Sequence, residues 1–241
     1  MSPLLASLPN SRPGPMSDSG SGAASLATAR PTSGRTAVLL IDLQVDFLDA
    51  DAGRTPVPAA LSRRVLHSAN RVLAGEVLCD ALPVLILNQF PRSDWLGNLV
   101  RRDAAIAGTP GARVDPRVAA RPDVPVFAKE RSDAFSNPAL GAYLRRAGVT
   151  TVWIIGVMSE GCVRATAMAA RRLGFDVIVP LEGIATNAAW KAKLATRLLR
   201  RAGVRLVPSV PAGPVVQTGN RTGQAAMAAG ISGLDATESS A

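Results

Sequence analysis

The stretch TTVWIIGVMSEGCVRATAMAA (150–170) decides the fold. Residues 150–156 form an apolar run, a glycine-bearing turn follows, and an Ala-rich helical pattern begins directly after the turn. A buried strand that passes into a helix in this way is typical of a parallel α/β sheet. Cys162 lies at the turn, where helix N-terminal amides favour negative charge and lower the pKa of a thiol. An enzyme places a nucleophile at such a position, although a small buried apolar residue is the alternative interpretation of this cysteine.

Further apolar runs elsewhere in the chain are too continuous for a half-exposed antiparallel sheet and therefore predict buried parallel strands. They cover residues 36–42, 83–88, 124–129, 175–180 and 204–208. Helical patterns between the runs cover about 59–80, 138–147, 161–173 and 187–202. Gly148, Gly174 and Gly203 each follow a helical pattern, as helix-terminating glycines do. This alternation predicts a doubly wound α/β fold: a mostly parallel sheet of about six strands with helices on both faces, in a Rossmann-like three-layer sandwich.

Two of these runs end in an ionisable residue. TAVLLID ends in Asp42 and continues into LQVDFLD, and VPVFAK ends in Lys129 before a polar turn. In open parallel sheets, ligands bind at the edge where the strands have their carboxyl ends. We therefore expect Asp42, Lys129 and Cys162 to converge at one edge, although a structural ion pair is the alternative for Asp42 and Lys129.

Three segments, DLQVDF, KERSDAF and GVMSEGCVRATA, occur in the order and at the spacing of known motifs. With these motifs the chain resembles the isochorismatase-like cysteine hydrolase superfamily, over roughly residues 36–207. The chain departs from the usual motif residues at Asp133, Ser159 and Ala169. None of these departures removes one of the three ionisable residues, so they affect the expected substrate more than the expected chemistry.

The resemblance implies hydrolysis of a small amide, ureido or carbamoyl C–N bond through a thioester acyl-enzyme. In this scheme Cys162 is the nucleophile, Asp42 is the base and then the acid, and Lys129 gives electrostatic support. The N–H groups of Cys162 and Met158 would form the oxyanion hole. The resemblance also implies a cis peptide between Val157 and Met158. Relatives usually associate, so a homo-oligomer, dimer or tetramer, is expected.

Four residues are candidates for the wall of the substrate pocket: Phe47, Asn88, Gln89 and Trp95. For Phe47 and Trp95, plain packing is an equally good interpretation. His67 is the single histidine of the chain. A histidine-based metal site, as in the nicotinamidases of the superfamily, is therefore not expected, and no cofactor is implied.

Two other functions stay open. One is an isochorismatase-type vinyl-ether hydrolase that uses Asp42 as a general acid, and the presence of Cys162 argues against it. The other is an inactive scaffold that binds a small molecule or a partner protein. Rapid alkylation of the thiol, with protection by substrate, would distinguish an activated nucleophile from both.

Composition limits the remaining classes. The net charge of +9 comes from arginines scattered in pairs with few aromatic residues, which favours solvated helix faces over nucleic-acid binding. No stretch approaches the ~18 apolar residues of a membrane span. Two cysteines make no disulfide framework, which favours a cytoplasmic location. We expect a disordered leader over 1–35, a hydrolase domain over 36–211 and a flexible tail over 212–241, with loops at 89–122 facing the substrate.

Overall fold

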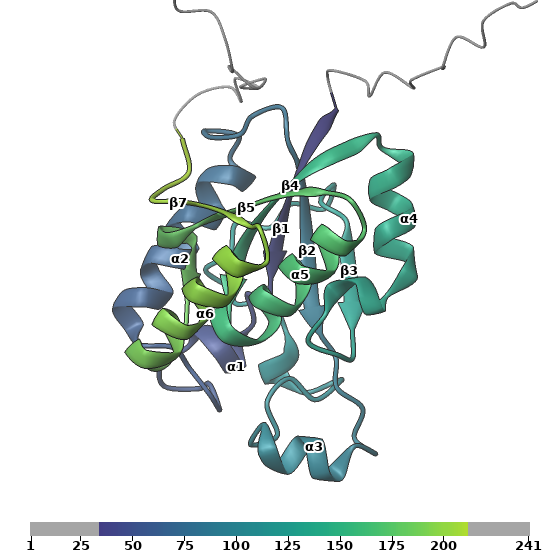
Figure 1. Ribbon diagram of the computed structural model, residues 1–241. Coiled ribbons are helices and arrows are strands. Elements are labelled where there is room, and N and C mark those ends of the chain that lie inside the picture. The colour runs from purple at the N-terminus through teal and green to yellow at the C-terminus, as the bar shows by residue number, and fades with distance from the viewer. Residues whose placement is uncertain (1–33, 212–241) are drawn as a thin grey trace, which may run out of the picture. The chain divides into compact units, whose positions relative to one another are not determined.

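The computed structural model describes residues 34–211, which form a parallel sheet covered by helices (Figure 1). The predicted leader and tail lie outside the described residues, apart from Gly34 and Arg35. The strands within 34–211 are β1 (Arg35–Ile41), β2 (Leu82–Asn88), β3 (Val126–Lys129), β4 (Val149–Val157), β5 (Asp176–Pro180), β6 (Ile184–Ala185) and β7 (Arg205–Val207). They pair in the order β3-β2-β1-β4-β5-β7, with β6 beside the end of β4, and every pairing of these strands is parallel.

The helices follow the alternation that the sequence predicts. The longer ones are α2 (Ala59–Leu73), α4 (Pro138–Arg146), α5 (Arg164–Arg172) and α6 (Ala189–Arg201). Shorter elements are α1 (Val45–Leu48), α3 (Trp95–Val100), η1 (Pro110–Ala112), η2 (Ala134–Ser136), η3 (Ser159–Val163) and η4 (Leu181–Gly183). Within residues 34–211, no helix is both long enough and apolar enough to cross a membrane.

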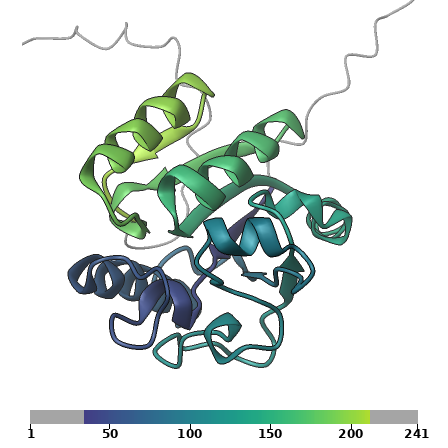
Figure 2. The same ribbon diagram turned by 90° about the horizontal axis from the view of Figure 1, so that it is seen from below.

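Two separate cores lie on the two faces of the sheet because successive strand residues point to opposite sides. In β1, Val38 and Leu40 pack into the core beneath α2, while Leu39 and Ile41 pack into the core beneath α4, α5 and α6. Figure 2 shows the blue helix α2 and the green helix α5 on opposite sides of the sheet. The predicted doubly wound fold with helices on both faces is therefore confirmed.

The element boundaries differ from prediction in a few places. The helix expected over 59–80 ends at Leu73, because Gly75 with φ 74° closes it. Gly148, Gly174 and Gly203 have φ values of 69°, 89° and 72°, as expected of helix-terminating glycines. The sheet holds seven strands within 34–211 rather than about six. The extra strand is β6, whose two residues are too few to give a strand pattern in the sequence.

Candidate active site

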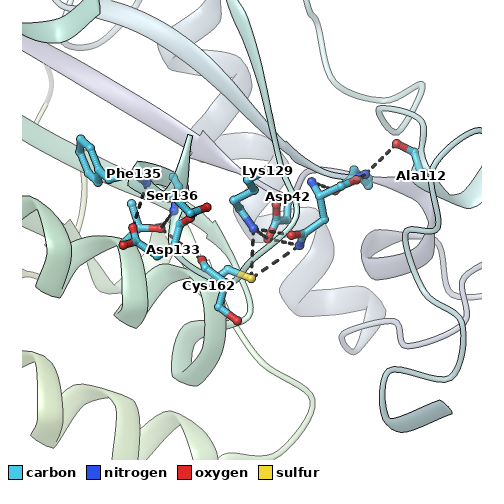
Figure 3. A network of polar contacts seen from close by, with 12 residues as sticks. Asp42, Ala112, Lys129, Asp133, Phe135, Ser136 and Cys162 are labelled. Atoms are coloured by element: carbon cyan, nitrogen blue, oxygen red, sulfur yellow. Dashed lines mark hydrogen bonds and ion pairs between the residues drawn. The ribbon is translucent and has the colours of Figure 1, made fainter. Parts of the chain in front are cut away.

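Three ionisable side chains meet at the carboxyl edge of the sheet. Asp42 directly follows β1, Lys129 is the last residue of β3, and Cys162 lies in the turn η3 after β4. Nζ of Lys129 lies 3.1 Å from Oδ2 of Asp42 and 3.4 Å from Sγ of Cys162. Figure 3 shows these side chains pointing toward one another. The expected convergence of the three residues is therefore observed.

The backbone turns sharply at Asp42 to bring its carboxylate into this cluster. The residue has φ 56°, a left-handed conformation that aspartate tolerates better than most side chains. Its N–H donates to the carbonyl of Ile86, which keeps the end of β1 beside β2. The carboxylate is only 1% exposed, and its Oδ1 has no hydrogen-bond partner among residues 34–211. That oxygen is consequently available to accept a proton.

Asn88 links the members of the cluster. Its Nδ2 donates to Oδ2 of Asp42 over 2.7 Å and lies 3.6 Å from Sγ of Cys162. Its Oδ1 accepts from Nζ of Lys129 over 2.6 Å. Asn88 and Lys129 are register partners at the ends of β2 and β3, so the sheet itself sets their separation. The structure thus places this predicted pocket residue inside the polar cluster.

Gln44 is a structural residue of the site that the sequence interpretation did not single out. It is fully buried, and its Nε2 donates to the carbonyls of Asn88 and Ala112 over 2.8 and 2.7 Å. Its Oε1 accepts from the N–H of Asn88 over 2.9 Å. The side chain therefore holds the backbone of Asn88 on both sides. The available signal was the place of Gln44 in the segment DLQVDF, two positions after Asp42.

Burial and the charges within the cluster together set its pKa values. Burial raises the pKa of Asp42 above 3.8, although the charge of Lys129 and the hydrogen bonds to the carboxylate oppose it. Burial by itself would lower the pKa of Lys129, but the charges of Asp42 and Cys162 outweigh it, so that pKa is raised. Burial and the neighbouring Asp42 raise the pKa of Cys162 to about 12. The expected lowering of the thiol pKa is therefore wrong for the protein without substrate, because burial is the largest influence on this pKa and raises it.

The turn that carries Cys162 differs in detail from the predicted helix start. Residues Ser159–Val163 form one wide π-type turn (η3), with a non-helical Gly161, and α5 begins only at Arg164. The carbonyl of Met158 accepts the N–H groups of Gly161 and Val163 over 3.0 and 3.2 Å. The Val157–Met158 peptide is cis, as the family resemblance implied. The oxyanion-hole role of Met158 and Cys162 stays a prediction.

The other predicted pocket residues lie in different environments. Phe47 is 8% exposed and packs in the core beneath α2. Gln89 follows β2, and its Nε2 donates to the carbonyl of Ala112 over 3.3 Å. Trp95 is 73% exposed at the start of α3, a helix that the sequence did not predict. A role for these residues in contacting substrate stays a prediction.

The donor set for a metal ion is poor. His67 lies on the exposed side of α2. Within the described part of the chain, no three His, Cys, Asp or Glu side chains are grouped closely enough to hold a metal ion. The residues present do not fit the histidine-based site expected of nicotinamidases.

The protein has a doubly wound parallel sheet and an Asp–Lys–Cys cluster at the carboxyl edge of that sheet. It therefore falls in the class of α/β proteins with a candidate cysteine nucleophile. The sequence profile of the isochorismatase domain matches residues 36–209, and the chain belongs to this family. The resemblance found from the three motifs is thereby confirmed.

Two streptothricin hydrolases of Streptomyces noursei are similar to this chain. One is 37% identical over 150 residues, which cover 62% of this chain and 49% of that protein. The other is 35% identical over 186 residues, which cover 76% of this chain and 68% of that protein. The chain thus spans about half the length of the first relative. Among solved structures, a pyrazinamidase of Pyrococcus horikoshii in complex with zinc superposes with a TM-score of 0.63 at 26% identity, covering 72% of this chain and 98% of that one.

Proposed function

We propose that the protein is a metal-independent cysteine amidohydrolase that cleaves a C–N bond of a small amide, ureido or carbamoyl compound. The observation that carries this proposal is the contact of one lysine with both the carboxylate and the thiol, at 3.1 and 3.4 Å. A buried cation placed between two acidic groups favours the state in which either of them is ionised. The thiol can therefore pass its proton to the carboxylate without a change in the net charge of the cluster.

The acylation half of the reaction starts with this proton transfer. The thiol of Cys162 gives its proton to Asp42, and the thiolate attacks the substrate carbonyl carbon. The N–H groups of Met158 and Cys162 would stabilise the negative oxygen of the tetrahedral intermediate. The C–N bond then breaks, and the leaving nitrogen takes the proton from Asp42. Ammonia or an amine departs, and a thioester remains on Cys162.

Deacylation uses the same groups. Asp42, ionised again, takes a proton from a water molecule, whose oxygen attacks the thioester carbonyl. Collapse of the second intermediate breaks the C–S bond, the thiolate recovers the proton, and a carboxylic acid or carbamic acid is released. Throughout both halves Lys129 remains protonated, which its raised pKa supports.

The relatives suggest where the search for a substrate begins. The two Streptomyces noursei relatives are named as hydrolases of streptothricin, so streptothricin is the first candidate substrate for this chain. A panel with nicotinamide, pyrazinamide, simple ureides and N-carbamoyl amino acids covers the wider class. The departures from the family motifs at Asp133 and Ser159 favour a substrate outside the nicotinamide type.

Acyl-enzyme trapping tests the mechanism. The protein is mixed with each compound, quenched in acid and measured by intact-mass spectrometry, while ammonia or amine release is followed in parallel. We expect a covalent adduct on Cys162 and turnover that Cys162→Ala abolishes. The matched control is Cys79→Ala, which removes the exposed second cysteine and leaves both signals unchanged. Turnover that survives in Cys162→Ala would contradict the proposed mechanism, because the C–N bond would then break without a thioester on Cys162.

A further inference from the structure

Three of the arginine pairs in the sequence stand at the ends of helices that cover the same face of the sheet. In the last turns of α4, α5 and α6 they are Arg145 and Arg146, Arg171 and Arg172, and Arg200 and Arg201. In both views of the ribbon α5 lies between α4 and α6 (Figures 1 and 2). Along the chain the pairs are scattered, which favours solvated helix faces, but the fold brings three of them to one edge.

This edge is the amino end of the sheet, opposite the candidate active site. In a parallel sheet the covering helices run back against the strands, so their last turns lie where the strands begin. Arg205 is the first residue of β7 and belongs to the same edge. Asp42 and Cys162 follow the carboxyl ends of β1 and β4, so a ligand at the amino edge does not contact them.

Positive charge gathers at this edge with little compensation. Residues 138–211 contain eleven Lys and Arg but only three Asp and Glu. Of these three, Asp176 stands at the amino edge and already pairs with Arg171. Six other arginines are exposed and form no ion pair and no side-chain hydrogen bond within residues 34–211. We call them the arginine edge: Arg145, Arg146, Arg172, Arg200, Arg201 and Arg205.

Helix electrostatics explains only part of the arginine edge. One cation in the last turn complements the partial negative charge of a helix C-terminus. Each of the three helices has two, and Arg205 begins a strand, where that effect is absent. The charge of Asp133 acts on Arg172, but the two form no ion pair. Because like charges on one surface repel one another, the surplus arginines favour an anionic partner that removes the repulsion.

The residue type and the arrangement indicate which anion fits. All six side chains are guanidinium groups, which bind phosphate through two parallel hydrogen bonds. Neighbouring helices lie about 8–10 Å apart, so the three helix ends form a row of roughly 20 Å. A row of this length is much longer than a single phosphate group. It therefore fits an extended chain of phosphates rather than a small ligand.

An anionic membrane and a single-stranded nucleic acid fit the arginine edge less well. Membrane docking needs an exposed apolar face beside the cations, and single strands stack on aromatic rings. Leu173, which is 44% exposed, is the large apolar residue next to Arg172. The exposed tryptophans of residues 34–211, Trp95 and Trp190, begin α3 and α6 and lie away from the last turns. A duplex, whose outer surface is phosphate, needs neither feature.

We propose that the arginine edge binds the phosphate backbone of a nucleic-acid duplex without reading its sequence. A row of roughly 20 Å spans about six base pairs, which brings about four phosphates within reach of the guanidinium groups. Contacts to phosphate alone carry no sequence information. This binding is independent of the proposed hydrolysis, because no residue of the arginine edge belongs to the polar cluster.

Fluorescence anisotropy of the full chain with a labelled DNA duplex tests this surface. Release of counterions from about four phosphates gives a slope of about −3.6 in log K against log salt, so affinity falls roughly 150-fold between about 50 and 200 mM salt. The combined variant Arg146→Gln, Arg172→Gln and Arg201→Gln should bind at least about tenfold more weakly, with a slope smaller in magnitude by about 2–3. Its release of ammonia from amide substrates should not change.

The matched control removes the same charge elsewhere. Arg63→Gln, Arg92→Gln and Arg113→Gln together replace three exposed arginines outside the arginine edge. This variant should bind the duplex within about threefold of wild type, because salt screens charges that lie beyond about 10 Å. Thermal melting of both combined variants verifies the fold.

Four results would overturn the proposal. Equal weakening in the two combined variants would show that net charge alone attracts the duplex. A slope smaller in magnitude than about 1 would exclude contact with several phosphates. Displacement of the duplex by polyglutamate at equal charge would indicate an acidic protein as the partner, and tighter binding to phosphatidylserine vesicles would indicate a membrane. A protein that hydrolyses none of the tested amides, but binds the duplex as described, would contradict the proposed function alone.

Discussion

Nδ2 of Asn88 lies 2.7 Å from Oδ2 of Asp42, and this short contact fixes the carboxylate in the cluster. The other end of the same amide accepts from Lys129, so one planar group holds the carboxylate and the ammonium at a set distance. The remaining carboxylate oxygen has no partner within residues 34–211. Asn88 thereby leaves one oxygen of Asp42 free for the proton that the proposed mechanism transfers.

Removal of this amide should impair catalysis. For Asn88→Ala we expect kcat to fall about tenfold to a hundredfold, because a hydrogen bond to a charged group contributes about 1.5–3 kcal/mol. Steady-state ammonia release measures the effect. The control is Asn70→Ala, which removes an amide bonded to the backbone of Arg117 and Ala119 outside the cluster. Activity of Asn88→Ala within about twofold of wild type would show that Asn88 is merely part of the pocket wall.

Asp42→Asn should separate thiol reactivity from turnover. Burial and the charge of Asp42 raise the pKa of Cys162, and the charge of Lys129 lowers it. With the carboxylate neutralised, burial still raises the thiol pKa but the charge of Asp42 no longer does, so this pKa falls below about 12. We therefore expect faster alkylation of Cys162 by iodoacetamide near pH 8, together with a loss of about 10²–10⁴ in kcat because the general base is gone.

The second cysteine is an internal control for this experiment. Cys79 is exposed, and its alkylation rate in the same mass spectra should not change. Slower alkylation of Cys162 in Asp42→Asn, with Cys79 unchanged, would mean that Asp42 serves the thiol as a base even in the absence of substrate. The charge argument would then be wrong.

The pH dependence of kcat/KM follows from the same cluster. Asp42 must be ionised to accept the thiol proton, so activity is present above its pKa and is lost as the pH falls through that value. Because burial raises the pKa of Asp42 above 3.8, the acid limb should lie at a higher pH than for an ordinary carboxylate. Lys129, whose pKa is raised above 10.5, stays charged, so the plateau should extend to about pH 10. Circular dichroism at each pH verifies folding, and an acid limb at or below about pH 4 would contradict the assignment.

Long apolar runs explain how much of the fold could be predicted. From Ala37 onward in β1 and from Val152 onward in β4, the residues are buried on both faces and their sequences are apolar, so the parallel sheet and its carboxyl edge could be predicted. β6 has two residues, and its pairing with β4 depends on tertiary contacts that leave no local pattern. The six residues of α3 likewise are too few for a clear helical period.

The candidate active site, like the fold, could be predicted from the sequence only in part. Asp42 and Lys129 could be found because each ends an apolar run, and Cys162 because it lies in the turn after another such run. The role of Gln44 depends on where β2 and Ala112 lie in space, 44 and 68 residues away in sequence, and no local pattern contains that information. The thiol pKa was predicted in the wrong direction for a related reason: the helix terminus is a local feature, whereas desolvation depends on the whole fold.

Gln44→Leu should destabilise the protein through this buried hydrogen bonding. The change keeps the volume but leaves the N–H and carbonyl of Asn88 without their side-chain partner, and we expect a loss of about 2–4 kcal/mol in the free energy of unfolding. Urea titration measures it. The matched control is Gln89→Leu, since Gln89 donates over 3.3 Å to the same carbonyl of Ala112 while partly exposed, and its loss should cost under about 1 kcal/mol. Equal losses in the two variants would contradict a special role for Gln44.

Gly156 sets the separation between the strands that carry Asp42 and Cys162. It is the register partner of Ile41 and has φ 142°, and a Cβ atom there would overlap the carbonyl oxygen of Ile41. Gly156→Ala must therefore push the ends of β1 and β4 apart, and we expect a loss of roughly 3 kcal/mol or more in stability together with most of the activity.

Gly174→Ala is the matched control for this change. Gly174 also has a positive φ of 89°, but a Cβ atom there would meet nothing within 4 Å. Its substitution tests backbone strain alone and should cost about 1–2 kcal/mol with normal kcat, because the residue terminates α5 far from the carboxyl edge. If Gly156→Ala cost no more than Gly174→Ala and kept its activity, contact between β1 and β4 at this point would not be what aligns the carboxylate with the thiol.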